Sequence, residues 1–371
     1  MRIGIPKEIK NNENRVGLLP YAVAQLVGDG HTVYVEKNAA AGIGVTDQQY
    51  EEVGAFILNT PEEIFNSSDM IIKVKEPQPS EIALFKPHHI VYTYLHLAAD
   101  KVLTEALMKT GATFIAYETI TGKNNSLPLL RPMSEVAGKV AVQVGANYLQ
   151  KNNGGKGILL GGATGVLPGK VVIIGAGVSG QSALKVAVGL GADVTVLDID
   201  IDKLSYLDDI YGTQIKTLYS TKANIENSII DADLVIGCIL LPGAKAPKLI
   251  TEEMIKKMEK GSVLVDVAID QGGCFETSKP TTHENPVYLV HGILHYCVAN
   301  IPGASPLTST YALNNATLKY ARELASLGVV ESCKKHTNLL AGLSIFNGKL
   351  VDKTVAKDLD LEFLEYVDFE S

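Results

Sequence analysis

A glycine-rich segment between two apolar runs constrains the fold of this 371-residue chain more than any other feature. It runs from Val171 to Asp198 with the sequence VVIIGAGVSGQSALKVAVGLGADVTVLD, which contains the pattern GxGxxG. The two apolar runs are typical of strands, and the stretch between them is typical of a helix that ends at Gly191. The pattern alone is weak, but in this context it predicts a βαβ unit that binds a dinucleotide.

Each glycine of the pattern has a physical role in such a turn. Gly175 permits the tight turn, Gly177 lets the backbone approach a pyrophosphate, and Gly180 lets the helix pack against the strand. The helix would offer its N-terminal N–H groups and positive dipole end to the phosphates. Asp198 would accept hydrogen bonds from the adenosine ribose hydroxyls and repel a 2′-phosphate. The segment therefore predicts NAD rather than NADP, and a βα turn with incidental glycines is the alternative.

Short apolar runs alternate with helix-like segments along most of the chain, which predicts an α/β fold with βα units on mostly parallel sheets. A length of 371 residues suggests two domains, at roughly 100–200 residues per domain. We expect strands at residues 2–6, 31–37, 70–75, 89–95, 112–118, 170–175, 193–198, 215–219, 233–240 and 262–269, with another near 295–298.

The pattern changes at residues 131–155, where we expect a long helix that links the two domains. Ser134 can cap this helix, and Asn-Asn-Gly-Gly ends it. A last helix should carry an apolar stripe from Leu313 to Leu327 and end at Gly328, and the segment after it should pack back on the first domain. The predicted domains are a discontinuous substrate domain, residues 1–130 with 305–371, and an NAD-binding domain, residues 131–304.

Composition narrows the class of protein. Hydrophobic residues make up 46% and charged residues 20%, as in ordinary globular proteins. A formal net charge of -8 argues against nucleic-acid binding. The start, MRIGIPKEIK, lacks the apolar core of a signal peptide, and no charge-free apolar run has the length of a membrane span, about 20 residues. The 4 cysteines are scattered, so we expect no disulfide framework, no zinc site and a reducing cytoplasm.

Three side chains in the first domain are candidates for binding or catalysis. The segment VYTYLHLAAD alternates like a strand and places His96 on the same face as Tyr92 and Tyr94, either as a core histidine or as a functional imidazole. Arg15 follows a polar loop, and Lys75 lies at the end of the strand in IIKVKEPQP. Arginine and lysine at such places suit a small anionic substrate, although each is more often a solvated surface charge.

Two acids and an amide stand out in the second domain. Asp266 and Asp270 both lie in GSVLVDVAIDQGGCFE, but only Asp270 is expected at the carboxyl end of the strand. Ligands bind outside the carboxyl ends of strands in open parallel sheets, so Asp270 is the better catalytic candidate. Asp266 is expected to be held within the strand region. Asn300 follows another strand, where its amide could hold a nicotinamide or its ribose.

These segments together closely resemble the family of NAD-dependent alanine dehydrogenases and transhydrogenase α-subunits, and among them the alanine dehydrogenases. The resemblance runs from Met1 to about Leu327, in the order found in the family, without a departure at the positions expected to be catalytic. It is carried by MRIGIPKEIKNNENRVGLLP, IIKVKEP, YTYLHLAA, AYET, LPLLRPMSEVAG, GAGVSG, VDVAIDQGGCFET and HYCVANIPGASP.

The resemblance implies a function and roles for the candidate residues. His96 would be the acid/base and Asp270 the second catalytic group, while Arg15 and Lys75 would hold the substrate's carboxylate and carbonyl. The reaction would be the reversible oxidative deamination of L-alanine to pyruvate and ammonia. The resemblance also implies two Rossmann-like, doubly wound domains around an interdomain cleft, and a homohexamer. NAD contacts would fall on Ser134, Val178, Ser179, Asp198, Lys203, Ser220, Ile239, Leu240, Val267, Ala268, Ile269, Asp270, Val298, Ala299, Asn300 and Ile301.

Other functions remain open at this point. The NAD-binding component of a proton-translocating transhydrogenase resembles the N-terminal and GAG segments, but it does not carry the histidine and aspartate found here as His96 and Asp270. Lysine- and saccharopine-type dehydrogenases share the architecture but fit the motifs less well. A non-catalytic NAD-binding module is the third alternative. The direction of the reaction and any side activity on glycine, serine or glyoxylate also remain open.

Overall fold

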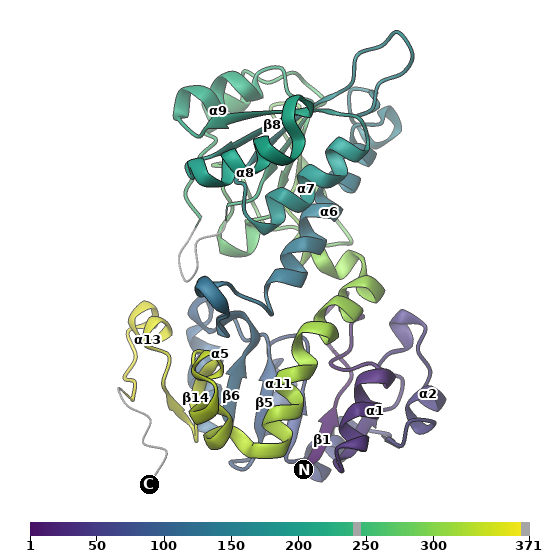
Figure 1. Ribbon diagram of the computed structural model, residues 1–371, viewed down its shortest axis with the longest axis vertical. Helices are drawn as coiled ribbons and strands as arrows, with labels where there is room; N and C mark the ends of the chain where they lie inside the picture. Colours follow the sequence, from purple (N-terminus) through teal and green to yellow (C-terminus); the bar gives the residue numbers. More distant parts are fainter. Residues whose placement is uncertain (240–245, 365–371) are drawn as a thin grey trace. The chain divides into compact units, whose positions relative to one another are not determined.

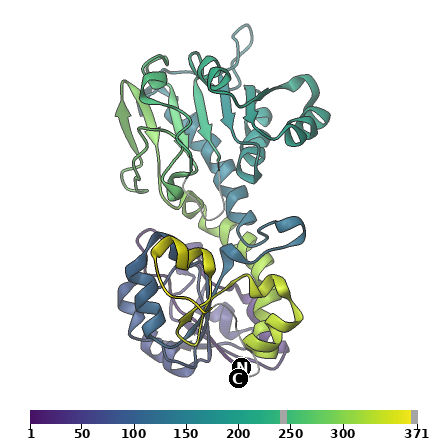
Figure 2. The ribbon, with the colours of Figure 1, turned by 90° about the vertical axis from the view of Figure 1, so that its left-hand side faces the viewer.

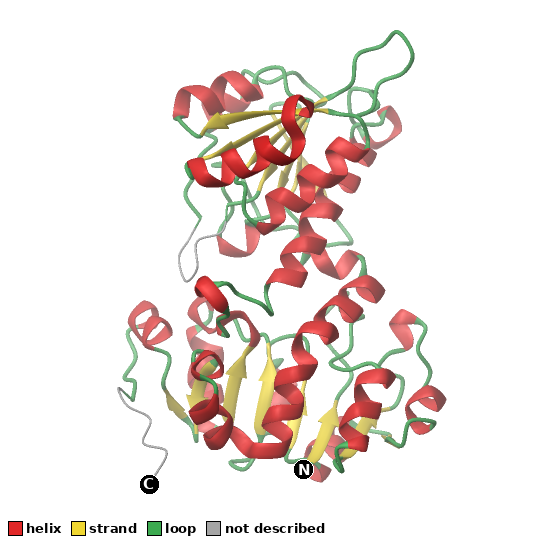
Figure 3. Cartoon of the chain, in the orientation of Figure 1, coloured by secondary structure: helices red, strands yellow, loops and turns green. Residues whose placement is uncertain are grey.

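The computed structural model describes residues 1–239 and 246–364. It divides the chain into two compact units, unit 1 (Met1–Met133 with Pro306–Ser371) and unit 2 (Ser134–Ser305), and each is described by itself (Figure 1). Each unit is an α/β structure with one sheet and helices packed against it (Figure 3). Among the described residues, no helix combines the length and apolar character needed to cross a membrane.

Unit 1 contains an 8-stranded sheet in the order β15-β14-β6-β5-β4-β1-β2-β3. The strands from β1 to β6 are parallel, whereas β14 and β15 are antiparallel to their neighbours. Because β14 hydrogen-bonds to β6, the C-terminal part of the chain completes the sheet that the N-terminal part begins. The strands are β1 (Arg2–Ile5), β2 (Thr32–Glu36), β3 (Phe56–Leu58), β4 (Met70–Ile72), β5 (Ile90–Thr93), β6 (Thr113–Ala116), β14 (Leu343–Phe346) and β15 (Lys349–Leu350).

Some helices of unit 1 begin where the sequence supplies a capping side chain. Thr60 accepts a hydrogen bond from Glu63 N at the start of α3, and Asp100 accepts one from Leu103 N at the start of α5. The helices are α1 (Pro20–Gly28), α2 (Asp47–Glu51), α3 (Pro61–Ser67), α4 (Pro79–Ile82), α5 (Lys101–Lys109), α11 (Pro306–Lys335), α12 (Thr337–Leu340) and α13 (Lys353–Leu359), with 3₁₀ turns η1 (Ala41–Ile43), η2 (Leu97–Ala99), η3 (Tyr117–Thr119) and η4 (Lys123–Asn125).

Unit 2 contains a 7-stranded sheet in the order β12-β13-β11-β10-β7-β8-β9, parallel except for β12 (Figure 2). Strand β7 lies between β8 and β10, so the chain order reverses beside it. The strands are β7 (Lys170–Ile174), β8 (Asp193–Asp198), β9 (Ile215–Tyr219), β10 (Leu234–Gly237), β11 (Val263–Asp266), β12 (Val287–Val290) and β13 (Ile293–Tyr296). The helices are α6 (Arg131–Tyr148), which begins in unit 1, α7 (Val178–Gly189), α8 (Ile201–Tyr211), α9 (Lys222–Ile229) and α10 (Glu252–Ile255), with 3₁₀ turns η5 (Lys151–Asn153), η6 (Gly212–Gln214), η7 (Ile269–Gln271) and η8 (Ile301–Ala304).

Buried apolar side chains cover both faces of each sheet. In unit 1, Met70 belongs to one apolar cluster and its neighbour Ile71 to another. In unit 2, Leu234 and Val235 divide in the same way. Because successive strand residues point to opposite faces, each sheet has a core on both sides, as expected for a doubly wound α/β fold. The predicted fold class is therefore confirmed.

Two predicted candidates lie beyond the strands expected to carry them. Strand β5 ends at Thr93, so His96 follows the strand instead of lying on its face. Strand β11 ends at Asp266, and Asp270 lies in the 3₁₀ turn η7. In both cases the apolar pattern continues past the last ladder hydrogen bond, which made the predicted strands too long.

Of two predicted helix limits, the start of α6 was wrong and the helix end at Gly328 is confirmed. Helix α6 begins at Arg131, so Ser134 lies inside the helix and does not cap it. Pro132 is tolerated because a proline in the first turn removes no helical hydrogen bond. Gly328 has non-helical φ and ψ of 73° and 176°, so the first helix within α11 ends there as predicted, and a second helix continues from this kink to Lys335.

Candidate active site

The glycine turn after β7 has the geometry that the sequence predicts. Gly175 has φ = +102°, and an added Cβ would lie 2.9 Å from the carbonyl oxygen of Cys238. At Gly180 an added Cβ would lie 1.8 Å from the Gly175 carbonyl oxygen, so a side chain would force the helix away from the strand. At Gly177 it would meet nothing within 4 Å, so the space beside this backbone is open. The turn thus combines tight packing with one open position.

Helix α7 starts directly from this turn. Gly177 is the N-cap and makes no side-chain capping bond, and Val178 and Ser179 are half-buried. The first N–H groups of a helix lack intrahelical partners and carry partial positive charge. Strand order reverses beside β7, where open α/β sheets bind their ligands. The residues present therefore fit the pyrophosphate of a dinucleotide.

Asp198 has a second role that the sequence did not reveal. Its side chain is 8% exposed at the end of β8. One carboxylate oxygen accepts a hydrogen bond from Ala176 N at 2.6 Å, and the other accepts one from Asp200 N at 2.9 Å. The carboxylate therefore ties the glycine turn to β8 and is held in a fixed orientation. Lys203 lies nearby in the sequence, and its ammonium pairs with Asp200 at 3.2 Å.

Most other residues expected to contact the cofactor follow parallel strands of unit 2. Ser220 comes directly after β9, and its N–H donates to the Asp198 carbonyl at 3.0 Å. Ile239 follows β10. Ser134 instead lies in α6, where Gly138 packs so closely against the start of α7 that an added Cβ would lie 2.0 Å from the Ser179 carbonyl oxygen. Val267, Ala268, Ile269 and Asp270 follow β11, Val298, Ala299, Asn300 and Ile301 follow β13, and Leu240 lies outside the described residues.

The loop that carries Asp270 is anchored by Asp266. The Asp266 carboxylate is fully buried and accepts hydrogen bonds from Ala268 N at 3.0 Å, Cys274 N at 2.9 Å and Ser278 Oγ at 2.5 Å. Burial raises the pKa of Asp266, and these hydrogen bonds oppose the increase. Asp270 is exposed at the turn of this loop. The expectation that Asp266 is held in the strand region is confirmed.

Asn300 adopts a backbone conformation that is uncommon for a side chain other than glycine. Its φ and ψ are 65° and 45°, in the left-handed region. Its carbonyl accepts hydrogen bonds from Gly303 N at 2.9 Å and from a ring nitrogen of His283, Nε2, at 3.1 Å. The turn after β13 is therefore fixed by its own backbone and by His283.

In unit 1, three predicted residues gather at the carboxyl edge of the sheet. Lys75 follows β4, His96 follows the neighbouring strand β5, and Arg15 lies in the segment after β1. Thr93 Oγ1 donates to the Lys75 carbonyl at 2.9 Å, which joins the ends of β4 and β5. Tyr94 lies close enough to the Arg15 guanidinium for the positive charge to lower the pKa of the Tyr94 hydroxyl, against the larger increase caused by burial. The sheet therefore brings two cations and an imidazole together from segments far apart in the sequence.

The imidazole of His96 is not part of the core. Its side chain is 46% exposed, and its ring stacks on Tyr94 with centroids 5.8 Å apart and planes 5° apart. Its backbone is left-handed, with φ = 52° and ψ = 36°. The alternative of a core histidine is therefore wrong, and the interpretation that remains is a functional imidazole that a ligand can reach.

Arg15 is paired with a residue that sequence reasoning missed. Its side chain is 2% exposed, and its Nε and Nη2 donate to the carboxylate of Glu13 at 2.7 and 2.5 Å. Its Nη1 lies 3.0 Å from Met133 Sδ. Burial alone would raise the pKa of Glu13, but the Arg15 hydrogen bonds and charge, with a contribution from Lys75, lower it to about 2. An acid two residues before Arg15 is the signal that could have indicated this pair.

Lys73 and Lys75 have different environments although both follow β4. Lys73 is fully buried, and its ammonium lies 3.3 Å from Glu8 and 2.7 Å from Glu81. Burial would lower the pKa of Lys73, but the two carboxylates raise it above its usual value. The Glu8 carboxylate also accepts hydrogen bonds from Val74 N at 2.6 Å and Lys75 N at 3.3 Å. Lys73 is thus structural, and its network holds the backbone that carries Lys75.

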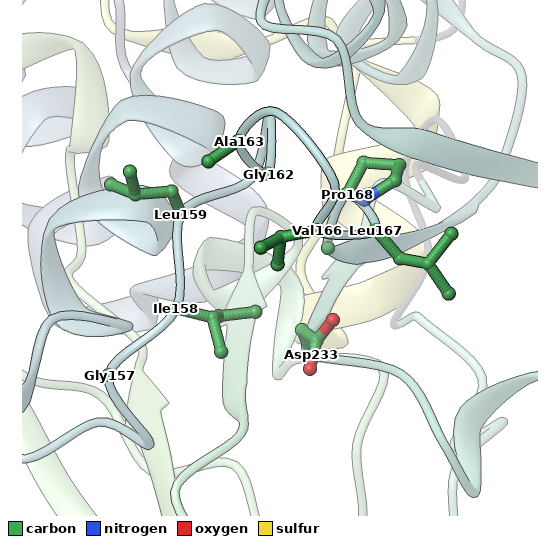
Figure 4. Close-up of a pocket in the computed structure, with 10 residues that line it drawn as sticks. Gly157, Ile158, Leu159, Gly162, Ala163, Val166, Leu167, Pro168 and Asp233 are labelled. Atoms are coloured by element: carbon green, nitrogen blue, oxygen red, sulfur yellow. The ribbon is translucent and has the colours of Figure 1, made fainter.

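A surface hollow of about 340 Å³ in unit 2 lies apart from these residues (Figure 4). Its walls are mainly apolar and come from the loop 157–169, with Asp233 as the acidic member. The Asp233 carboxylate pairs with Lys156 at 2.6 Å. None of the residues expected to bind substrate or cofactor lines this hollow, so it is not the candidate active site.

Family models match nearly the whole chain. Residues 4–137 match the model described as Alanine dehydrogenase/PNT, N-terminal domain, and residues 141–353 match Alanine dehydrogenase/PNT, C-terminal domain. The chain belongs to the alanine dehydrogenase/PNT family. Its relatives in this family include an alanine dehydrogenase of Methanococcus maripaludis, 54% identical with 98% of both chains covered, and one of Bacillus subtilis, 53% identical with 98% of this chain and 96% of that protein covered.

Solved structures place the fold in the same family. A structure of L-alanine dehydrogenase superposes with a TM-score of 0.94 at 49% identity, covering 97% of this chain and 99% of that one. A transhydrogenase structure from Sinorhizobium meliloti superposes with a TM-score of 0.81 at 26% identity, covering 95% and 99%. The family therefore includes both enzymes that the sequence analysis considered, and the alanine dehydrogenases are the more similar.

Proposed function

We propose that this chain is an NAD-dependent L-alanine dehydrogenase that converts L-alanine, NAD⁺ and water reversibly into pyruvate, ammonium, NADH and a proton. The observation that carries the proposal is the group formed by Arg15, Lys75 and His96 at one sheet edge, two buried cations beside an exposed imidazole. Curated relatives named alanine dehydrogenase, identical at 53–54% of positions over nearly the whole chain, support the same activity.

The two cations would bind the substrate through its carboxylate. Glu13 holds the Arg15 guanidinium through Nε and Nη2, and the guanidinium charge would attract and bind the substrate carboxylate. Lys75 is a point charge that would polarise the carbonyl oxygen of pyruvate and stabilise negative charge there. Glu13 holds the Arg15 side chain, and Glu8 accepts a hydrogen bond from the Lys75 backbone N–H, which reduces the cost of orienting these two residues.

His96 and Asp270 would carry the proton transfers. Imidazole accepts and releases protons near neutral pH, as a reaction that runs in both directions requires. When bound, NAD⁺ would supply the oxidising power by accepting the hydride of the substrate Cα. The amine loses a proton, water activated by His96 or Asp270 attacks the imine carbon, and proton transfer through His96 releases ammonia.

The cofactor would be NAD rather than NADP. Gly175, Gly177, Gly180 and the start of α7 would hold the pyrophosphate, as their geometry fits. The Asp198 carboxylate would accept hydrogen bonds from the ribose hydroxyls with its remaining lone pairs and repel a 2′-phosphate. The rest of the predicted contacts, Ser134, Val178, Ser179, Lys203, Ser220, Ile239, Leu240, Val267 to Asp270 and Val298 to Ile301, belong to the same proposal.

Two further properties belong to the proposal. The family resemblance alone suggests that the enzyme acts as a homohexamer. The 4 scattered cysteines suggest that it works in the reducing cytoplasm. Size-exclusion chromatography with light scattering would measure the assembly directly.

The deciding experiment is NADH formation by the purified chain with NAD⁺ and each of L-alanine, glycine, L-serine and L-lysine, repeated with NADP⁺. We expect fast turnover mainly with L-alanine and NAD⁺. Slow turnover of glycine or serine is compatible, because one methyl group discriminates by only about 1–3 kcal/mol. No turnover with any amino acid but tight NADH binding would favour a transhydrogenase-like component or a non-catalytic module.

A further inference from the structure

Glu118 lies beside His96 although the two residues are 22 positions apart in the sequence. Strand β6 ends at Ala116, and Glu118 follows it in the turn η3, next to the end of β5. Its side chain is 15% exposed. One oxygen, Oε1, accepts hydrogen bonds from His96 N at 2.6 Å and from Leu95 N at 3.1 Å, and Oε2 lies 3.3 Å from Leu95 N. A single carboxylate therefore holds the two peptide groups that lead into the histidine.

The backbone that Glu118 holds is strained. A left-handed conformation is unfavourable for a residue with a Cβ, because the Cβ crowds the following carbonyl oxygen, and His96 adopts it with φ = 52°. Leu95, just before it, is fully buried, whereas the His96 side chain is 46% exposed, so the chain turns sharply at this point. Hydrogen bonds from N–H groups to a carboxylate are stronger than neutral ones and can offset such strain.

The Glu118 carboxylate hydrogen-bonds to the backbone of His96, whereas its contact with the ring is a longer ion pair that requires a protonated imidazole. The distance from Glu118 Oε1 to His96 Nδ1 is 3.8 Å, which is beyond a hydrogen bond. The ring is instead oriented by stacking on Tyr94, whose hydroxyl donates to the Leu129 carbonyl at 2.6 Å. Glu118 sets where the histidine leaves the backbone, and Tyr94 sets the plane of its ring.

We propose that Glu118 is a positioning residue for the acid/base His96, holding the left-handed turn from which the imidazole reaches the substrate. The inference rests on the proposed function, because it assigns a partner to the proposed acid/base. It predicts different results for two substitutions. Oε1 accepts hydrogen bonds from both N–H groups, and Oε2 shares only the one from Leu95. The amide oxygen of Glu118→Gln can therefore take the place of Oε1 and keep the turn, whereas Glu118→Ala loses every one of these bonds.

Kinetics with L-alanine and NAD⁺ would separate the two variants. We expect kcat to fall about 10- to 100-fold in Glu118→Ala, since a small misplacement of a catalytic group has effects of this size, and to stay within about threefold in Glu118→Gln. The dissociation constant of NADH should stay unchanged in both. Glu63→Ala is the matched control, because Glu63 also accepts a backbone N–H, from Asn59 at 2.7 Å, but lies on α3.

A double substitution tests whether Glu118 acts through His96. In a His96→Ala background, Glu118→Ala should cause no further loss of kcat, because there is no imidazole left to position. A further loss equal to that in the wild-type background would overturn the proposal, as would equal losses in the Gln and Ala variants. A kcat within twofold of wild type in Glu118→Ala would do the same.

Hydrogen exchange at the Leu95 and His96 amides gives a readout independent of turnover. Exchange of these amides, followed by mass spectrometry of peptides covering residues 94–99, should accelerate in Glu118→Ala and stay slow in Glu118→Gln and Glu63→Ala. Unchanged exchange in Glu118→Ala would show that the carboxylate does not hold the turn. Wild-type protein without alanine turnover would refute the proposed function, while the exchange data would still decide whether Glu118 holds His96.

Discussion

Replacing Glu13 with glutamine tests the buried ion pair that holds the proposed substrate-binding arginine. Glu13 is 6% exposed, and its carboxylate accepts hydrogen bonds from the backbone N–H, Nε and Nη2 of Arg15 at 3.0, 2.7 and 2.5 Å. Burial alone would raise the pKa of Glu13, but these bonds and the guanidinium charge lower it from 4.5 to about 2. The folded protein therefore favours the ionised Glu13 carboxylate more than the unfolded chain does.

The size of the effect follows from that difference. Between 4.5 and about 2, at ~1.4 kcal/mol for each tenfold change in the proton dissociation constant, the ionised carboxylate adds about 3 kcal/mol to the free energy of unfolding. Because the pKa is lower in the folded state, this stabilisation is present above about pH 5 and is lost as the pH falls toward 2. About half of it should remain at pH 3.

Urea unfolding of wild type and Glu13→Gln at pH 7, 5, 4 and 3 would measure the stabilisation that the ionised Glu13 carboxylate provides. We expect the variant to be less stable by about 3 kcal/mol at pH 7, with the gap narrowing to about half at pH 3. Glu63→Gln, an exposed glutamate of the same unit, serves as the control and should show no such narrowing. A gap that stays constant with pH, or one below about 1 kcal/mol at pH 7, would refute the reasoning.

Three other predictions concern the cofactor and substrate sites. Gly177→Ala should change the free energy of unfolding by less than about 1 kcal/mol and weaken NADH binding. Gly180→Ala should instead lower the melting temperature, because its Cβ meets the Gly175 carbonyl. Melting curves and NADH titrations that change alike in the two variants would contradict this difference. His96→Ala and Asp270→Asn should each lose about 10² or more in kcat and still bind NADH, and wild-type turnover would remove either residue from the mechanism. Arg15→Lys should mainly raise the KM for pyruvate and alanine because the guanidinium fork is lost, so an unchanged KM would argue against the assignment.

The sequence alone determined the elements whose pattern is local. The predicted limits of β8 and β9 agree with the structure, because each strand is an apolar or alternating run bounded by turn residues. The glycine turn was also predicted, since glycine is required there by the backbone itself. The strands β3, β12, β14 and β15 were missed, and three of them, β3, β12 and β15, are edge strands of their sheets. Such strands are stabilised by a neighbour in the sheet more than by their own sequence.

Tertiary structure alone decided which charges support the candidate site. The sequence placed Arg15, Lys75 and His96 near strand ends. The partner of Arg15, Glu13, is local, but those of the other two are distant in the sequence: Glu8 reaches Lys75 across 67 residues, and Glu118 reaches His96 across 22. Parallel strands collect their carboxyl ends at one edge of a sheet, in an order set by topology and not by the sequence. The sequence pattern indicates which side chains lie at the carboxyl edge of the sheet. Only the burial and the ion pairs seen in the folded structure determine which of these side chains hold the candidate residues in place.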